Sequence, residues 1–285
     1  MNLPRLYIAG SAAFAAIMVV LVFLVLIMSS WGAISSEGLS LFTHKWHPAK
    51  GEFGVLPMIF GSAAVTLIAL TIATPLGLLA AIFTSELLNP AWRAPVKSAL
   101  EILAGIPSII YGLIGVAFFS IWIGNLFDLQ SGRTILTAGI LLAVMILPTI
   151  ITLCDDALHN VPLKYRESAS GLGLYKYEVV RDVLLPIAKT DITGAILLAL
   201  GRALGETMAV MLVIGSIDRV PDPFFNVLEA GQSITSKLGR EIAESSFGSV
   251  HFSALIFMSL ILVAITVSLT SFTQYYFRRE KRLVE

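Results

Sequence analysis

ESASGLGLYKYEVVRDVLLP, residues 167–186, separates two long apolar segments and decides how the chain is organised. A helix can begin at Pro162, Gly171 and Gly173 interrupt the pattern, and Pro186 closes it, so we predict two short helices joined by a glycine turn. In the second arm, apolar and charged residues alternate at helical spacing. The apolar set is Leu172, Val179, Val183 and Leu184, and the charged set is Lys176, Glu178, Arg181 and Asp182. We expect one face to pack and the other to stay free.

The overall composition is that of a membrane protein. Of the 285 residues, 56% are hydrophobic and 13% charged, and the mean hydropathy is +0.86. The formal net charge is zero, so no basic surface suggests a nucleic-acid partner. Cys154 is the only cysteine, which excludes a disulfide within the chain.

Six segments are long and apolar enough to cross a bilayer as helices, which takes about 20 residues each. The first, from Ile8 to Met28, is longer than the apolar core of a secretory signal, so we interpret it as an uncleaved span. We therefore predict one transmembrane domain over residues 1–285, an all-α polytopic fold. The spans are expected near residues 8–28, 58–83, 100–123, 135–153, 192–215 and 252–276, with a cytoplasmic loop at 154–189.

The basic residues predict the orientation of these spans. Twelve Lys and Arg residues lie on the side of both termini and of the loop at 154–189, and six lie on the other side. By the positive-inside rule, both termini and this loop are expected in the cytoplasm.

Two outer segments contain residues of interest. His44 and His47 are three residues apart, but no third ligand lies nearby and Pro48 follows, so we expect no metal site. Further along, Ile234, Leu238 and Ile242 follow a helical period, with Lys237, Arg240 and Glu241 between them. This pattern predicts a helix against the outer surface or touching an external partner.

Prolines and glycines interrupt several spans. Residues Thr74 and Pro75 predict a break in the second span, and Pro148 predicts a kink in the fourth. The third contains GIPSIIYG at 105–112, which predicts a break near the hydroxyls of Ser108 and Tyr111. Such interruptions either bend helices for packing or line a polar pathway, and the sequence leaves both open.

Two charged residues lie near the centre of the fifth span, within LGRALGETM at 200–208. Arg202 and Glu206 are four residues apart, so a continuous helix would place them on one face, where they can pair. A charge at a helix centre costs about 2.5–3.5 kcal/mol on insertion scales, so two of them require a reason. Either they form a structural ion pair, or they belong to an anion pathway in which Arg202 binds an oxyanion and Gly201 and Gly205 permit close approach.

The 167–186 stretch resembles the coupling loop of permease subunits of ATP-driven (ABC) importers. That loop has the form EAA, three residues, G, nine residues, I-x-LP; Ser168 and Val183 are the departures here. The resemblance implies a type I ABC importer permease fold, with Tyr165 to Val179 docking on a separate ATPase subunit. The matching residues are Glu167, Ala169, Gly173, Leu185 and Pro186.

Three further stretches resemble the permeases of phosphate-specific importers, the PstC type in particular: FGVLPMIFG at 53–61, GIPSIIYGL at 105–113 and GRALGETMAV at 201–210. The likeness spans residues 53–279. It implies a bacterial inner-membrane complex of this chain, a sister permease, two ATPase subunits that hold ATP and Mg²⁺, and an external phosphate-binding protein. Arg202 and Glu206 match the family's intramembrane charged pair, and Ser108, Tyr111 and Thr207 are expected along the substrate pathway.

Other functions remain open on the residues alone. No lysine follows a glycine, so the chain lacks a phosphate-binding loop and ATP hydrolysis is expected on another chain. A membrane enzyme would draw on Asp155, Asp156 and His159, which we interpret as solvated loop charges. A permease for sulfate or molybdate, or an ion-coupled secondary carrier, would share most of these features.

Overall fold

The computed structural model describes the backbone of residues 3–284 and the side chains of residues 7–271. Residues 1, 2 and 285 of the predicted domain lie outside the described residues. So do the side chains of Arg5 and of the basic residues at 278–282, which contributed to the predicted orientation.

The described chain is almost entirely helical. Its first half begins with a long helix and a short hairpin and continues through two broken helices. The elements are α1 (Leu3–Glu37), β1 (Trp46–His47), β2 (Glu52–Phe53), α2 (Leu56–Ile82), α3 (Pro90–Gly105), α4 (Ser108–Ile114) and α5 (Ser120–Leu126). Strands β1 and β2 pair antiparallel. Single 3₁₀ or π turns occupy Gly38–Phe42, Pro48–Lys50, Phe83–Leu87 and Gly115–Phe119.

The second half contains the central helix α6, two further long helices and several short ones. Its elements are α6 (Ile135–His159), α7 (Leu163–Gly171), α8 (Lys176–Glu178), a π segment (Val179–Leu184), α9 (Leu185–Gly205), α10 (Met208–Val213), α11 (Ile234–Glu241) and α12 (Val250–Val284).

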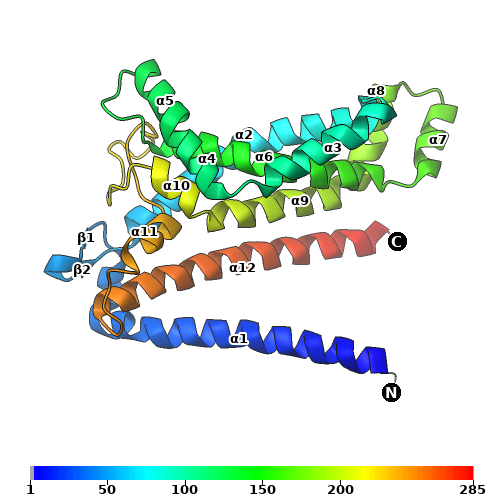
Figure 1. Ribbon diagram of the computed structural model, residues 1–285. Helices are drawn as coiled ribbons and strands as arrows, with labels where there is room; N and C mark the ends of the chain where they lie inside the picture. The colour runs from blue at the N-terminus through cyan, green and yellow to red at the C-terminus, as the bar shows by residue number, and fades with distance from the viewer. Residues whose placement is uncertain (1–2, 285) are drawn as a thin grey trace.

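Six of the described helices are long and apolar enough to cross a membrane. They cover Tyr7–Phe42, Leu56–Leu87, Ser108–Leu126, Ile135–His159, Lys176–Gly205 and Val250–Ser271. Each overlaps a predicted span, although the third begins eight residues later than expected because α3 ends at Gly105. In Figure 1, α7, α8 and the marked N and C ends lie at one end of the bundle, while β1, β2 and α11 lie at the other. The structure thus places the predicted cytoplasmic elements together. Following that prediction, we call their end of the bundle the inner end and the opposite end the outer end.

The core is built around α6, which packs against α2 and α9. Two glycines allow α2 and α6 to approach closely. A Cβ at Gly77 would lie 2.6 Å from a methyl of Ile150, and a Cβ at Gly139 would lie 2.5 Å from a methyl of Ile68. In lipid, helices associate mainly through close van der Waals packing, because the hydrophobic driving force between them is missing. Small residues at a crossing permit that close packing.

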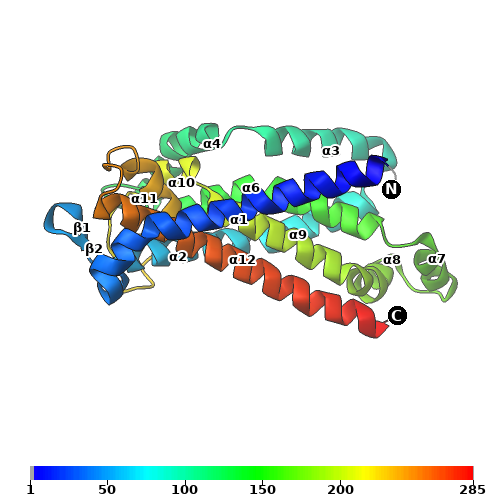
Figure 2. The same ribbon diagram turned by 90° about the horizontal axis from the view of Figure 1, so that it is seen from below.

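Helices α1 and α12 pack against each other at the outer end, where Gly32 of α1 meets Ser253 of α12. From there α1 diverges, as Figures 1 and 2 show. None of the residues in the most apolar 18-residue stretch of this first span is buried. This apolar surface is suited to lipid or to a partner subunit.

Several sequence-based boundaries were wrong. Pro75 does not break the second span, because it lies inside the continuous helix α2, where surrounding helical turns hold the backbone on both sides of its ring. Pro148 lies inside α6, and the kink predicted there stays a prediction. Helix α6 continues to His159, so the predicted loop at 154–189 begins with helix. Pro186 does not close a short arm. It is the second residue of α9, which continues directly from the π segment that ends at Leu184, because the wide turn before it tolerates its missing N–H.

The outer end is held together by a buried lysine. Lys237 of α11 is 3% exposed, and its Nζ lies 2.5 Å from Asp218 Oδ2 and 2.5 Å from Glu241 Oε1. Glu241 also accepts hydrogen bonds from Trp46 Nε1 at 3.1 Å and pairs with His251 Nε2 at 3.0 Å. Burial raises the pKa of Glu241, but the hydrogen bonds from Lys237, His251 and Trp46 outweigh burial and leave the pKa below its usual value. The helix predicted around Ile234, Leu238 and Ile242 exists as α11, Ile234–Glu241, but Lys237 is enclosed.

Replacing Lys237 with methionine should destabilise the outer end, because it leaves Asp218 and Glu241 without their buried cation. We expect a loss of about 3–5 kcal/mol, measured as a lower thermal unfolding midpoint in detergent. Lys45→Met removes an exposed lysine of the same outer region and is the control. Equal midpoints for the two variants would contradict a structural role for the cluster.

Candidate functional site

The inner hairpin presents an exposed face that we call the docking face, made of Leu163, Tyr165, Leu172, Tyr175 and Tyr177. Its turn depends on Gly173, whose φ of 84° is unfavourable for a residue with a Cβ. After the turn, the Glu178 carboxylate accepts a hydrogen bond from the Tyr175 N–H at 2.7 Å. This bond caps the start of α8. The predicted glycine turn between two helices is therefore confirmed, but the second helix is not short, because it continues into α9.

The packed side of the hairpin differs partly from the prediction. Ala169, Val179 and Leu184 are buried, but Leu172 is 81% exposed. The prediction for Leu172 was wrong because this residue follows α7 in the turn, outside the helical period of the second arm. Glu167 is exposed beside the docking face, whereas Leu185 is half-buried and Pro186 is exposed at the start of α9.

An arginine clamp holds α7 against the inner ends of two spans. Arg166 Nη1 lies 2.6 Å from both carboxylate oxygens of Glu86, and its Nη2 donates to the Leu158 carbonyl at 2.7 Å. Glu86 is in the π turn after α2, and Leu158 is in α6. These contacts tie α7 to the inner ends of α2 and α6. Sequence reasoning missed this clamp because its partners are 80 residues apart.

The interpretation of Asp155, Asp156 and His159 as solvated loop charges was wrong about the loop, and Asp155 is buried, whereas Asp156 and His159 do face solvent. All three lie on α6 and contact the start of α3, where Arg93 binds Asp155 at 3.1 Å and His159 at 3.0 Å. Lys97 binds Asp156 at 2.7 Å, and this hydrogen bond raises the pKa of Lys97 above its usual value. The extension of α6 beyond residue 153 brings these acids to α3. Their side chains thus join α6 to α3.

The fifth span is broken at its charged residues. Helix α9 ends at Gly205, Glu206 takes an extended conformation (φ −69°, ψ 122°), and α10 begins at Met208. The prediction that Arg202 and Glu206 pair along one helix face was wrong for this reason. The carboxylate of Glu206 instead accepts from the Ala209 N–H at 3.2 Å and caps the first turn of α10.

Arg202 joins three helices at this break. Its Nη1 donates to Thr149 Oγ1 of α6 at 3.1 Å, and its Nη2 donates to the Ala104 carbonyl of α3 at 3.3 Å. The residue is nevertheless exposed on the surface of the single chain. An exposed guanidinium within a span must face water or another subunit, because lipid cannot solvate it.

The break in the third span was predicted correctly and lies beside that of the fifth. Helix α3 ends at Gly105, α4 begins at Ser108, and the Tyr111 hydroxyl donates to the Leu103 carbonyl at 2.9 Å across the gap. A Cβ at Gly112 would lie 3.0 Å from the Ala209 Cα of α10. Thus Ser108, Tyr111, Arg202 and Glu206, which are distant in sequence, belong to two adjacent breaks.

Thr207 and Glu206 also contact the outer helices. Thr235 of α11 donates its hydroxyl to the Glu206 carbonyl at 2.7 Å, which satisfies a backbone acceptor freed by the break. A small cavity beside Glu206 is lined by the hydroxyls of Ser62, Thr66 and Ser233, among other residues. The fifth-span break therefore has polar surroundings on the side of α2 and α11.

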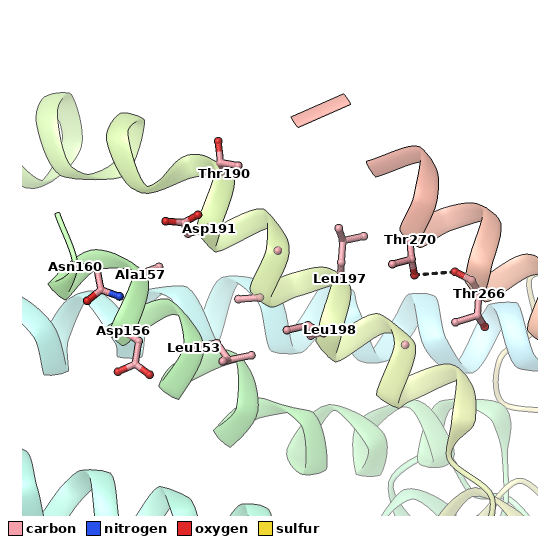
Figure 3. Close-up of a pocket in the computed structure, with 13 residues that line it drawn as sticks. Leu153, Asp156, Ala157, Asn160, Thr190, Asp191, Leu197, Leu198, Thr266 and Thr270 are labelled. Carbon is pink, nitrogen blue, oxygen red and sulfur yellow. Dashed lines mark hydrogen bonds between the residues drawn. The ribbon is translucent and has the colours of Figure 1, made fainter. Parts of the chain in front are cut away.

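An open crevice of about 710 Å³ runs between α6, α9 and α12 on the inner side of Arg202. Figure 3 shows Leu153 and Asp156 on one wall, Asp191 and Leu198 on α9, and Thr266 on α12. Gly201 also borders the crevice, one residue before the exposed arginine.

A broken-helix bundle with an inner docking hairpin and a mid-span guanidinium defines a transporter membrane subunit. Residues 73–282 match the family described as "Binding-protein-dependent transport system inner membrane component". The chain belongs to this family. It is accordingly a multi-pass permease of the inner membrane in an ABC transport system, and ATP is bound by a partner ATPase. This excludes the membrane-enzyme and secondary-carrier alternatives.

Two of three relatives carry the name of a phosphate transport system. The "Phosphate transport system permease protein PstC" of Mesorhizobium japonicum is 36% identical, over 89% of this chain and 83% of its own length. The protein of the same name from Pasteurella multocida is 37% identical, over 94% and 88%. A Bacillus subtilis relative, "Probable ABC transporter permease protein YqgH", is 36% identical, over 83% and 76%.

Solved structures of importers share the fold. A subunit of a bacterial alginate ABC transporter superimposes with a TM-score of 0.59 at 14% identity, covering 97% of this chain and 96% of that one. A subunit of the MetNI methionine transporter in inward-facing conformations gives 0.56 at 17% identity, covering 81% and 94%. The predicted importer-permease fold is therefore confirmed.

Ala169 lies on the packed side of α7, where it is buried. Replacing it with leucine should displace the docking face, because overpacking a buried site costs about 1–3 kcal/mol. We expect less ATPase subunit to co-purify with the variant. Ser170→Leu adds the same side chain at the next, exposed position and is the matched control. Equal co-purification of both variants would show that the burial of Ala169 does not position the face.

Proposed function

We propose that this chain is the PstC-type permease subunit of an importer that moves inorganic phosphate into the cytoplasm. The observation that carries the proposal is the exposed guanidinium of Arg202 at the junction of two broken spans. A planar, permanently charged donor suits a small oxyanion. The names of the relatives, which extend over most of the chain, favour phosphate among such anions.

We infer that the active assembly contains this chain, a sister permease, two ATPase subunits and an external phosphate-binding protein. The exposed position of Arg202 supports a second permease, because a partner surface would close the pathway around the guanidinium. The largely exposed helix α1 supplies further apolar surface for such a partner. Both permeases would then contribute to one central pathway.

The docking face is proposed to bind the ATPase in the cytoplasm. It carries exposed aromatic residues, and the excess of basic residues at this end of the sequence agrees with a cytoplasmic location of both termini. Glu167, Ala169, Gly173, Leu185 and Pro186 would form and support the coupling element. Closure of the ATPases would move α7, and the Arg166–Glu86 clamp would pass that movement to α2 and α6.

We propose that Arg202 and Glu206 bind the anion, and that Ser108, Tyr111 and Thr207 line the pathway on which it moves. Phosphate keeps a proton near neutral pH and can donate a hydrogen bond, whereas sulfate cannot. A carboxylate near the guanidinium would therefore favour phosphate over sulfate. Reorientation of the broken helices would change the side to which this site opens.

Reconstitution tests the proposed function directly. Proteoliposomes with this chain, its sister permease and the ATPase, supplied with phosphate-loaded binding protein, should take up phosphate only when ATP is present. Sulfate uptake under the same conditions is the comparison. Uptake without ATP, or equal transport of sulfate, would contradict the proposal.

Variants of the central charges separate a substrate role from a structural one. Arg202→Gln should assemble but lose nearly all uptake, because the anion loses its charged donor. Glu206→Gln retains an oxygen that can cap Ala209, so we expect normal assembly and a smaller preference for phosphate over sulfate. Thr149→Val, which removes only one partner of Arg202, should retain most uptake. Unchanged uptake and selectivity in both charge variants would make the two residues structural.

A further inference from the structure

Two arginines that the proposed pathway does not use converge on an outer pocket. A pocket of about 320 Å³ is lined by Arg133, Met211, Leu212, Gly215, Ser216 and Arg240. Arg133 lies in the connection between α5 and α6, Arg240 lies on α11, and Ser216 follows α10. Because these elements are far apart in sequence, the pocket exists only in the folded chain.

Neither guanidinium in this pocket is neutralised. Among the residues whose side chains are described, no carboxylate pairs with Arg133 or Arg240, and both arginines are exposed. The neighbouring acids are engaged elsewhere, since Asp218 binds Lys237 and Glu229 binds Arg219. The pocket therefore has positive charge available for an anion.

The backbone at the pocket is held in an uncommon conformation. Gly215 has a φ of 91° and Ser216 a φ of 60°, and the second value is unusual for a residue with a side chain. Tertiary packing maintains this turn, because Gly231 donates to the Ile214 carbonyl at 2.9 Å and Ile217 donates to the Gly231 carbonyl at 3.1 Å. Ser216 thereby lines the same pocket as the two arginines.

The pocket leads to the central break. Helix α10 connects Thr207 at the break to Gly215 at the pocket, and its six residues rise by about 9 Å in total. Helix α11 runs beside it, since a Cβ at Gly239 would lie 2.9 Å from Thr207 and 3.5 Å from Met211. Arg240 is the next residue. One side of α10 thus carries a positive site at its outer end and the Glu206–Thr207 break at its inner end.

We propose that Arg133, Arg240 and Ser216 form an outer oxyanion site that receives phosphate before it reaches Arg202. This proposal rests on the proposed function and adds a second, earlier binding station to it. Two guanidinium groups and a hydroxyl offer the donors that a small divalent oxyanion requires. The site holds the released anion near the pathway and limits its escape outward.

The test uses the complete reconstituted transporter with saturating phosphate-loaded binding protein at fixed ionic strength. Phosphate uptake and ATP hydrolysis are measured together. The double variant Arg133→Gln/Arg240→Gln should lower the phosphate transported per ATP hydrolysed at least fivefold, because released anion escapes. Its half-saturating concentration of binding protein should stay unchanged. Arg133→Lys/Arg240→Lys keeps the charge without the planar fork and should give an intermediate ratio.

Arg219→Gln is the matched control, because it removes an outer arginine that is 63% exposed, lies outside the pocket and pairs with Glu229. It should leave the ratio unchanged. An unchanged ratio in the double variant overturns the site, and a raised half-saturating concentration alone assigns the arginines to docking of the binding protein. Should the double glutamine variant fail to assemble, the single variants decide, each expected to lower the ratio at least twofold.

The two proposals fail in different ways. Absence of ATP-dependent phosphate uptake by the unmodified complex would overturn the proposed function. Normal uptake by that complex, with an unchanged ratio in the arginine variants, would overturn only the outer site.

Discussion

In a bilayer, every backbone polar group needs a partner within the protein, and this requirement governs the centre of the molecule. Two spans are interrupted, after Gly105 and after Gly205, and each interruption frees carbonyl and N–H groups. The fold places the interruptions side by side and satisfies them mutually. Arg202 binds the end of α3, and Thr235 binds the carbonyl of Glu206. The polar interior of the bundle follows from this arrangement.

Charged groups with little exposure join separate elements at both ends of the molecule. At the inner end, Arg166 and Glu86 tie the docking hairpin to α2 and α6. At the outer end, Lys237 of α11 binds Asp218, and α11 packs against the break of the fifth span through Gly239. The outer helix is thus in direct contact with the break.

The sequence predicted most of the architecture because lipid imposes strong constraints. Helix length and apolarity located six spans, and the glycine turn at Gly173 and the break at Pro107 were visible in the residue pattern. The errors have a common cause. Pro75 was expected to interrupt a helix, and Arg202 was expected to pair with Glu206 along one. In each case the outcome depends on whether neighbouring helices supply partners for the backbone, which local sequence does not reveal.

The sequence by itself determined that this chain is a polytopic helical membrane protein with an ABC-permease coupling loop and a charged centre, since hydropathy, loop charge and motif register are local properties. The tertiary structure alone decided which charges meet. It separated Arg202 from Glu206, joined Arg166 to Glu86, enclosed Lys237 and brought Arg133 to Arg240. The physical reason is that contacts between residues 50 to 200 positions apart depend on helix packing, and packing is fixed by side-chain shape throughout the bundle.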